Sequence, residues 1–99
     1  MMRRLLFVLL LIGCVSSTPV ETTLSGRVTN YDDGTPVAGA DVNIQSVYAT
    51  TDANGEYFVT RLSPGRHTII ITRRGFTTFR REIDLRAGEN RHDVELIRR

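Results

Sequence analysis

The sequence predicts an all-β fold, an antiparallel sandwich or small barrel, from three observations. Apolar and polar residues alternate in short runs from residue 22 onward. The segments between these runs are rich in Gly, Pro, Asn and Asp. No window after residue 21 has the apolar spacing of an amphipathic helix. Because alternation with a period of two buries one face of a strand and leaves the other in water, this pattern is typical of antiparallel sheets.

Each predicted strand contributes a small set of apolar side chains that share one parity. We expect these side chains to form the core and the residues between them to face solvent. The sets are Leu24, Gly26 and Val28; Ala40, Val42 and Ile44; Tyr57 and Val59; Ile69 and Ile71; Phe79, Ile83 and Leu85; and Val94 and Leu96.

Turn-forming residues separate the predicted strands. The sequence DANG at 52–55 predicts a tight turn in which Asn54 and Gly55 adopt positive φ. The sequence SPGR at 63–66 suits a type II turn, because Pro64 fixes φ and Gly65 accepts the positive φ that follows. Further loops are expected at 32–36, 74–75 and 87–90. Six or seven short strands with such turns favour a sandwich or a small barrel.

The first 14 residues predict export and lipid attachment. Two arginines precede eight consecutive apolar residues at 5–12. This run is less than half of the ~20 residues that a membrane-spanning helix needs, and it fits the apolar region of an export signal. Leu11-Ile12-Gly13-Cys14 resembles the lipobox of bacterial lipoproteins, which implies cleavage before Cys14 and acylation of its thiol. The alternative is a plain secretory signal with a chance cysteine.

We therefore expect a lipoprotein signal peptide at 1–13, a lipidated Cys14 with a short tether at 14–21, and one domain at 22–99. The tether after Cys14 spans at most about 25 Å, so the domain is expected close to the lipid surface. Val15, rather than Asp, follows the cysteine. In a Gram-negative cell the resemblance then points to the outer membrane, facing the periplasm or the surface.

Composition argues against nucleic acid as a partner. All 13 basic residues are arginines, and two of them lie in the predicted signal peptide. The remaining 11 arginines match the 11 acidic residues, so the mature charge is near zero and lacks the basic excess of a nucleic-acid binder. With a single cysteine, no internal disulfide can form, and the core alone must stabilise the domain.

An ordered series of motifs resembles one known family. The motifs are GRV at 26–28, GTPVAGADV at 34–42, TDANGEY at 51–57, LSPG at 62–65 and GF at 75–76. Together they resemble the carboxypeptidase regulatory-like domain over about residues 22–96. This resemblance implies a seven-stranded antiparallel Greek-key sandwich of the transthyretin (prealbumin) type. It also implies a supporting, spacing or binding role, because the peptidase's zinc and catalytic residues belong to a different domain.

The remaining polar residues predict no catalytic site, metal or cofactor. His67 shares the parity of Ile69 and is expected at the edge of the core, and His92 is expected near solvent at the start of a strand. Loop oxygens match no calcium loop, and turn chemistry explains them better; they belong to Asp32, Asp33, Asp52 and Asn54. The transthyretin-like 5-hydroxyisourate hydrolases end in Tyr-Arg-Gly-Ser, whereas this sequence ends in Leu-Ile-Arg-Arg, so that activity is not expected.

Two surfaces are candidates for contact with partners. Phe58 and Ile70 have outward parity on strands expected to be neighbours across the Pro64-Gly65 turn, and with the loop residue Tyr48 they would offer an apolar patch to a protein or sugar. The alternative is cross-strand packing without a ligand.

Lipid phosphates are candidate ligands of the four arginines that flank one predicted hairpin. The alternative there is a solvated face that pairs with Glu82 and Asp84. These arginines are Arg73, Arg74, Arg80 and Arg81.

Together these features predict a non-enzymatic lipoprotein of the cell envelope, held to the membrane through lipid on Cys14 and serving as an interaction or scaffold module for an unidentified envelope protein or glycan. The first alternative is a carbohydrate-binding accessory domain, although Trp is absent and Tyr scarce. A small transthyretin-like hydrolase is the second alternative, and the lack of a catalytic motif in the sequence argues against it.

Overall fold

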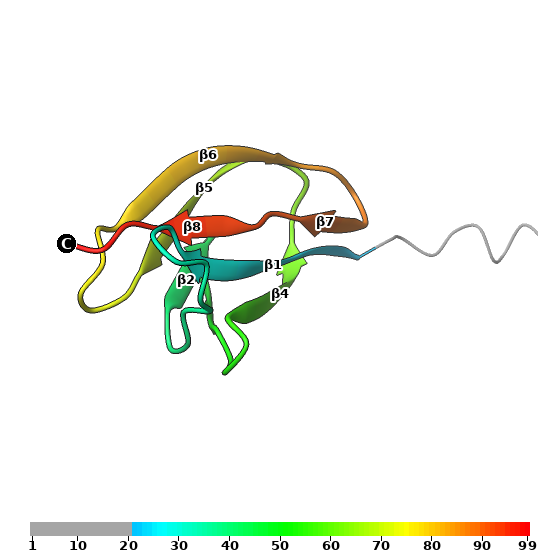
Figure 1. Cartoon of the computed structure of the whole chain (residues 1–99). Helices are drawn as coiled ribbons and strands as arrows, with labels where there is room; N and C mark the ends of the chain where they lie inside the picture. Colours follow the sequence, from blue (N-terminus) through cyan, green and yellow to red (C-terminus); the bar gives the residue numbers. More distant parts are fainter. Residues whose placement is uncertain (1–20) are drawn as a thin grey trace, which may run out of the picture.

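The computed structural model describes residues 21–99, which form eight β-strands and no helix (Figure 1). The predicted all-β class is therefore confirmed. The strands are β1 (Thr22–Asn30), β2 (Asp41–Ile44), β3 (Val47–Thr50), β4 (Glu56–Leu62), β5 (Gly65–Thr72), β6 (Phe79–Leu85), β7 (Glu89–Arg91) and β8 (Val94–Leu96). The predicted signal peptide and Cys14 lie outside the described residues, as does the tether up to residue 20.

The strands form the two packed sheets of a sandwich. One sheet has the order β4-β1-β7, with β8 also paired to β1, and the other has the order β3-β2-β5-β6. Within residues 21–99, β2–β3 and β5–β6 are hairpins, and every other connection up to β7 crosses between the sheets. No helix in residues 21–99 has the length and apolar character needed to cross a membrane.

Pairing is antiparallel except at one edge, where β7 and β8 both run parallel to β1. The expectation of a wholly antiparallel sandwich is wrong at this edge. The chain reaches it by crossing from β6 in the opposite sheet, and alternation of residue types along a strand does not encode the direction of its neighbour.

The strands β7 and β8 are two halves of one edge strand, which explains why eight strands are found where seven were predicted. One half pairs with residues 23–25 of β1 and the other with residues 28–30. In the break between them, the Tyr57 hydroxyl donates a hydrogen bond to the His92 carbonyl at 2.6 Å. The Arg27 N–H donates to Asp93 Oδ1 at 2.9 Å. These side chains replace the missing ladder bonds, so the two halves stay aligned on β1.

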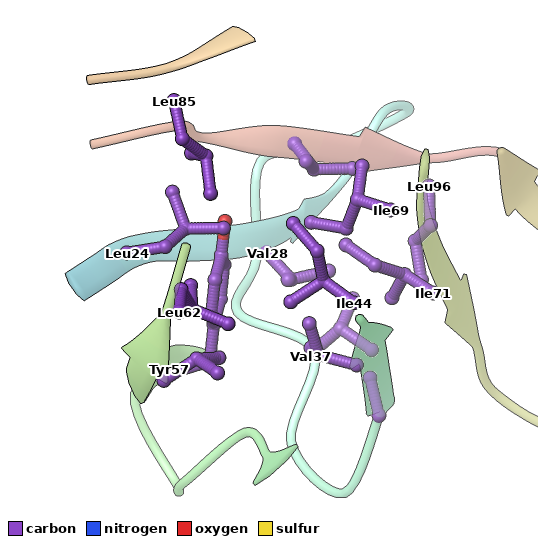
Figure 2. Packing of buried hydrophobic residues seen from close by; sticks show 14 residues of the cluster. Leu24, Val28, Val37, Ile44, Tyr57, Leu62, Ile69, Ile71, Leu85 and Leu96 are labelled. Carbon is purple, nitrogen blue, oxygen red and sulfur yellow. The ribbon is translucent and has the colours of Figure 1, made fainter. Parts of the chain in front are cut away.

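Fourteen buried apolar side chains fill the space between the sheets (Figure 2). The predicted core residues are among them, except that Phe79 and Ile83 are only partly buried and Gly26 has no side chain. The core is Leu24, Val28, Val37, Ala40, Val42, Ile44, Tyr57, Val59, Leu62, Ile69, Ile71, Leu85, Val94 and Leu96. Fully burying one Val, Leu or Ile side chain contributes roughly 1.5–3 kcal/mol, so this cluster is the main source of stability in a domain without a disulfide.

The sequence interpretation missed β3 and the turn before it. Gln45 and Ser46 both adopt positive φ, 54° and 64°, as a two-residue type I′ hairpin turn requires. The Gln45 side chain holds this turn against the β4–β5 link, because its Nε2 donates to the Ser63 carbonyl at 3.0 Å and its Oε1 accepts the Ser63 N–H at 3.0 Å. Tyr48 therefore lies on an edge strand and not in a loop.

The predicted turns are only partly as expected. Gly55 has the expected positive φ of 77°, and its N–H donates to the Asp52 carbonyl at 2.9 Å, but Asn54 does not adopt positive φ. Gly65 also has a positive φ, 123°. Its turn joins strands of different sheets rather than closing a hairpin.

Candidate functional site

Both histidines contribute to the fold. His67 is half-buried at the edge of the core, and its Nε2 lies 3.0 Å from the Ser63 carbonyl oxygen. Because a carbonyl only accepts, this ring nitrogen carries the proton. His92 is half-buried in the break between β7 and β8, two positions before β8 begins. Its N–H donates to the Ser25 carbonyl at 2.9 Å. The His67 ring therefore has a local structural contact, and His92 contributes to the fold through its backbone N–H and carbonyl.

Tyr57 is the one titratable residue in the core of residues 21–99, and its hydroxyl has a structural task. The ring is buried, and the hydroxyl donates to the His92 carbonyl. Burial raises the pKa of this phenol above its ordinary value of 10, and the nearby Asp93 carboxylate raises it further. The hydroxyl is therefore neutral at physiological pH and acts as a donor.

The loop carboxylates organise turns. Asp52 Oδ1 accepts the N–H groups of Asn54 and Glu56, each at 2.9 Å. Asp33 Oδ1 accepts the Thr35 N–H at 3.1 Å and the Thr35 hydroxyl at 2.8 Å, and these bonds lower the pKa of Asp33. In the part of the chain that the structure describes, no group of three or more His, Cys, Asp or Glu side chains is placed to hold a metal ion.

The predicted patch of Phe58 and Ile70 does not exist as one surface. Phe58 lies on β4 and Ile70 on β5, and these strands belong to different sheets. The expectation that they are neighbours is wrong, because the Pro64-Gly65 turn crosses between the sheets. Their outward side chains therefore occupy opposite faces of the sandwich.

Tyr48 and Ile70 do share a face, through a row that the sequence interpretation missed. Tyr48 pairs with Asn43, Asn43 with Ile70, and Ile70 with Arg80 across the sheet β3-β2-β5-β6. Tyr48 is 73% exposed at one edge of this row, and Arg80 is exposed at the other. The order of the row depends on which strands pair, which no single strand's pattern reveals.

The four arginines flank the β5–β6 hairpin as predicted, but they do not form one patch. Arg73 and Arg74 lie in the loop of the hairpin, while Arg80 and Arg81 occupy adjacent positions of β6 and so point to opposite faces. The expected pairing with Glu82 and Asp84 is also wrong. Those carboxylates lie 3.5 Å and 3.3 Å from the guanidinium of Arg66, which β5 places beside them.

Arg81 lines a groove at the side of the sandwich, between β6 and β8. We call this the side groove; its volume is about 480 Å³. The Arg81 guanidinium stacks over Phe79 at 5.4 Å from the ring centroid. Because Arg81 has the inward parity of Phe79 on an edge strand, it also opposes edge-to-edge pairing with other strands. Charges of both signs line the groove, including Arg27, Asp93 and Glu95.

Arg73 and Arg74 line a second concavity at the opposite end of β1 from the tether. Its volume is about 520 Å³, and we call it the distal pocket. The chain enters the domain at Thr22, whereas the loop between β5 and β6 lies with the C-terminus at the far end (Figure 1). The pocket also contains Arg99, which the sequence interpretation missed. Its partners Gly75 and Phe76 lie more than 20 positions away, so only the folded chain brings them together.

Sequence comparison places the chain in a known family. A model of the carboxypeptidase regulatory-like domain matches residues 23–96. Structural protein 27 of a virus (isolate Australia/Victoria) is 32% identical over 76 residues, which cover 77% of this chain but only 15% of the viral protein.

Solved structures share the fold. A chain of the type II cohesin–X-dockerin complex of Acetivibrio cellulolyticus, solved as an interface mutant, is 26% identical with a TM-score of 0.59, over 77% of this chain and 56% of that one. The minor pilin GBS52 of Streptococcus agalactiae is 14% identical with a TM-score of 0.61, over 82% of this chain and 46% of the pilin. The chain thus spans about half of each of these structures. Since the family match extends from β1 to the end of β8, the chain belongs to the carboxypeptidase regulatory-like domain family.

Proposed function

We propose that this protein is a non-enzymatic lipoprotein of the cell envelope, anchored through Cys14, and that its sandwich is a protein-interaction module. In a Gram-negative cell the anchor would lie in the outer membrane. The proposal for the anchor draws on the basic start, the apolar run and the Leu-Ile-Gly-Cys sequence at residues 11–14. Two or more acyl chains hold a protein stably, because each buried CH₂ contributes about 0.8 kcal/mol.

The composition of the tether-distal end is the observation that supports the interaction role most. Tyr31 and Ile97 are 61% and 57% exposed, and each directly follows one of the paired strands β1 and β8. The Tyr31 N–H donates to the carbonyl of Leu96, so the two residues are close together at this end. Four arginines lie at the same end: Arg73, Arg74, Arg98 and Arg99. Aromatic residues and arginine are enriched in protein interfaces and dominate their hot spots.

The relatives favour the same role. The structure from Acetivibrio cellulolyticus that resembles this chain is a complex of proteins, and another is a pilin subunit. A domain of this family that resembles such structures is better explained as a module that contacts other proteins than as an enzyme. His67 and Tyr57 also have structural tasks, which leaves them poorly placed for catalysis.

Metabolic labelling tests the anchor. Cells that express the full chain are grown with a clickable palmitate analogue, and the wild type is compared with Cys14→Ala. We expect label and membrane retention in the wild type, and loss of both in the variant. An unlabelled wild type, or a Cys14→Ala protein that stays in the membrane fraction, would refute the lipoprotein assignment.

One observation favours carbohydrate binding as the second candidate function. Tyr48 is exposed directly beside the amide of Asn43, and an aromatic face next to a hydrogen-bonding group suits a sugar ring. A glycan array comparing the wild type with Tyr48→Ser tests this. Signals that vanish in the variant would support a sugar site on this sheet, whereas unchanged signals would exclude Tyr48 from it.

A further inference from the structure

The distal pocket concentrates positive charge. Arg73, Arg74 and Arg99 line it, and Asp41 is the one acidic side chain among its lining residues. Ion pairs elsewhere in residues 21–99 involve Arg66 and Arg91 and none of these three arginines. Three guanidinium groups around one concavity repel one another, and an anion placed among them relieves that repulsion.

The fold holds two of these guanidinium groups in place. Gly39 adopts a φ of 73°, and a Cβ built on it would lie 3.5 Å from the Arg73 guanidinium carbon, so that group rests against the loop before β2. Arg99 Nε donates to the Phe76 carbonyl at 3.2 Å, and the Arg99 N–H donates to the Gly75 carbonyl at 3.0 Å. Side chains that are already positioned lose less conformational entropy when a ligand binds.

We propose that the distal pocket binds an acidic segment of a protein partner, with carboxylates held by Arg73, Arg74 and Arg99. The inference rests on the interaction role proposed above and specifies the chemistry of the partner. The planar guanidinium offers paired N–H donors that match the two oxygens of a carboxylate, which is why arginine serves such contacts.

The other groups in the pocket favour a peptide over a phosphate. Asp41 only accepts hydrogen bonds and carries a negative charge, so it repels a phosphate group, which also offers mainly acceptors. A peptide brings backbone N–H donors for Asp41 as well as carboxylates for the arginines. The hydroxyls of Thr72 and Thr78 can donate to or accept from either kind of group. A volume of about 520 Å³ also exceeds that of one phosphate and accommodates several side chains.

The position of the distal pocket also argues against lipid headgroups of the anchoring membrane as its ligand. The nine residues of β1 extend roughly 30 Å between the tether and the distal end. The tether reaches at most about 25 Å, which is too short to turn the distal end squarely onto the membrane. An anchored domain thus cannot press its distal end squarely onto its own bilayer, which leaves the distal pocket open to a protein partner.

Fluorescence anisotropy with defined probes tests the proposal. The full chain in nonionic detergent is titrated into a short fluorescein-labelled polyglutamate peptide, with a polylysine peptide of equal length as the reference probe. We expect binding of polyglutamate that weakens with added salt, and no binding of polylysine. The double variant Arg73→Glu/Arg74→Glu should raise the Kd about tenfold or more, because each charge-assisted contact contributes substantially. Arg73→Lys/Arg74→Lys should lie in between, since lysine keeps the charge but lacks the bidentate geometry.

The matched control is Arg61→Glu/Arg86→Glu, which makes the same change of charge at exposed positions of the tether end. It should bind polyglutamate like the wild type. Equal loss in both double variants would show diffuse attraction and overturn the proposal. Absence of polyglutamate binding would overturn it too, as would Arg73- and Arg74-dependent binding of inorganic phosphate or phosphatidylglycerol vesicles in place of the peptide. None of these readouts depends on Cys14, so failure here leaves the labelling test of the anchor unaffected.

Discussion

Replacing Tyr57 by Phe should destabilise the domain measurably, although it removes a single oxygen atom. The Tyr57 hydroxyl donates at 2.6 Å to the His92 carbonyl in the break between β7 and β8. This contact joins β4, at one edge of its sheet, to the interrupted strand at the other edge, with Gly26 of β1 between them. Phe fills the same volume, so the change isolates the hydrogen bond from the packing of the ring.

The magnitude follows from what remains behind. Within residues 21–99, the His92 carbonyl accepts its hydrogen bond from the Tyr57 hydroxyl. The neighbouring Arg27 N–H does not bond to this carbonyl, because it donates to Asp93 instead. Leaving a partly buried carbonyl without a protein partner costs up to about 1–3 kcal/mol. For a domain of this size, each kcal/mol lowers Tm by roughly 4–8 °C, so a loss near the middle of the range corresponds to roughly 8–16 °C.

Thermal unfolding followed by circular dichroism measures this effect, and Tyr48→Phe provides the control. Tyr48 is 73% exposed, so removing its hydroxyl should leave Tm nearly unchanged. If Tyr57→Phe unfolds at the wild-type temperature, the hydroxyl does not hold the broken strand, and the explanation of that break is wrong. If both variants lose stability equally, the effect does not arise from this contact.

Three further predictions concern the same core. Because the folded pKa of Tyr57 is raised, folding should lose stability as the pH rises above its unfolded pKa of about 10, and a pH series of urea unfolding should show a shallower loss in Tyr57→Phe. Gly26→Ala should destabilise by about 1–3 kcal/mol, because its Cβ would overlap the His92 carbonyl; a wild-type urea midpoint would contradict this crowding. Ile71→Ala should cost about 2–5 kcal/mol, as for a fully buried side chain, and the half-buried Ile70→Ala much less; equal costs would mean that the inward and outward faces of β5 are misassigned.

The sequence predicts much of the core because strand parity is a local property. Along β1, Leu24 and Val28 are buried while Arg27 is exposed, as the alternation requires, because successive side chains point to opposite faces. The hairpin turn before β3 was not predicted, for one local and one long-range reason. Gln45-Ser46 lacks the Asn-Gly or Asp-Gly signature, and its positive φ values are supported by the distant Ser63.

The candidate surfaces were harder to predict because they depend on which strands pair. Phe58 and Ile70 were assigned the correct outward parity, but parity does not reveal that β4 and β5 belong to different sheets. Similarly, Arg73 and Arg74 were identified as flanking a hairpin, while their neighbour Arg99 arrives only when the C-terminal segment pairs with residues 75–77. These sites could not be predicted from the sequence alone, because they depend on contacts between segments that lie far apart in the chain.

Site-specific photocrosslinking in intact cells tests most directly whether the anchored domain contacts a protein through its distal end. A photoreactive amino acid replaces Thr78, which lines the distal pocket, or Arg86, which is exposed near the tether end. We predict a discrete protein adduct from position 78 that disappears with Arg73→Glu/Arg74→Glu, and none of comparable yield from position 86. No adduct at position 78, or equal adducts at both positions, would contradict an interaction module that acts through this end.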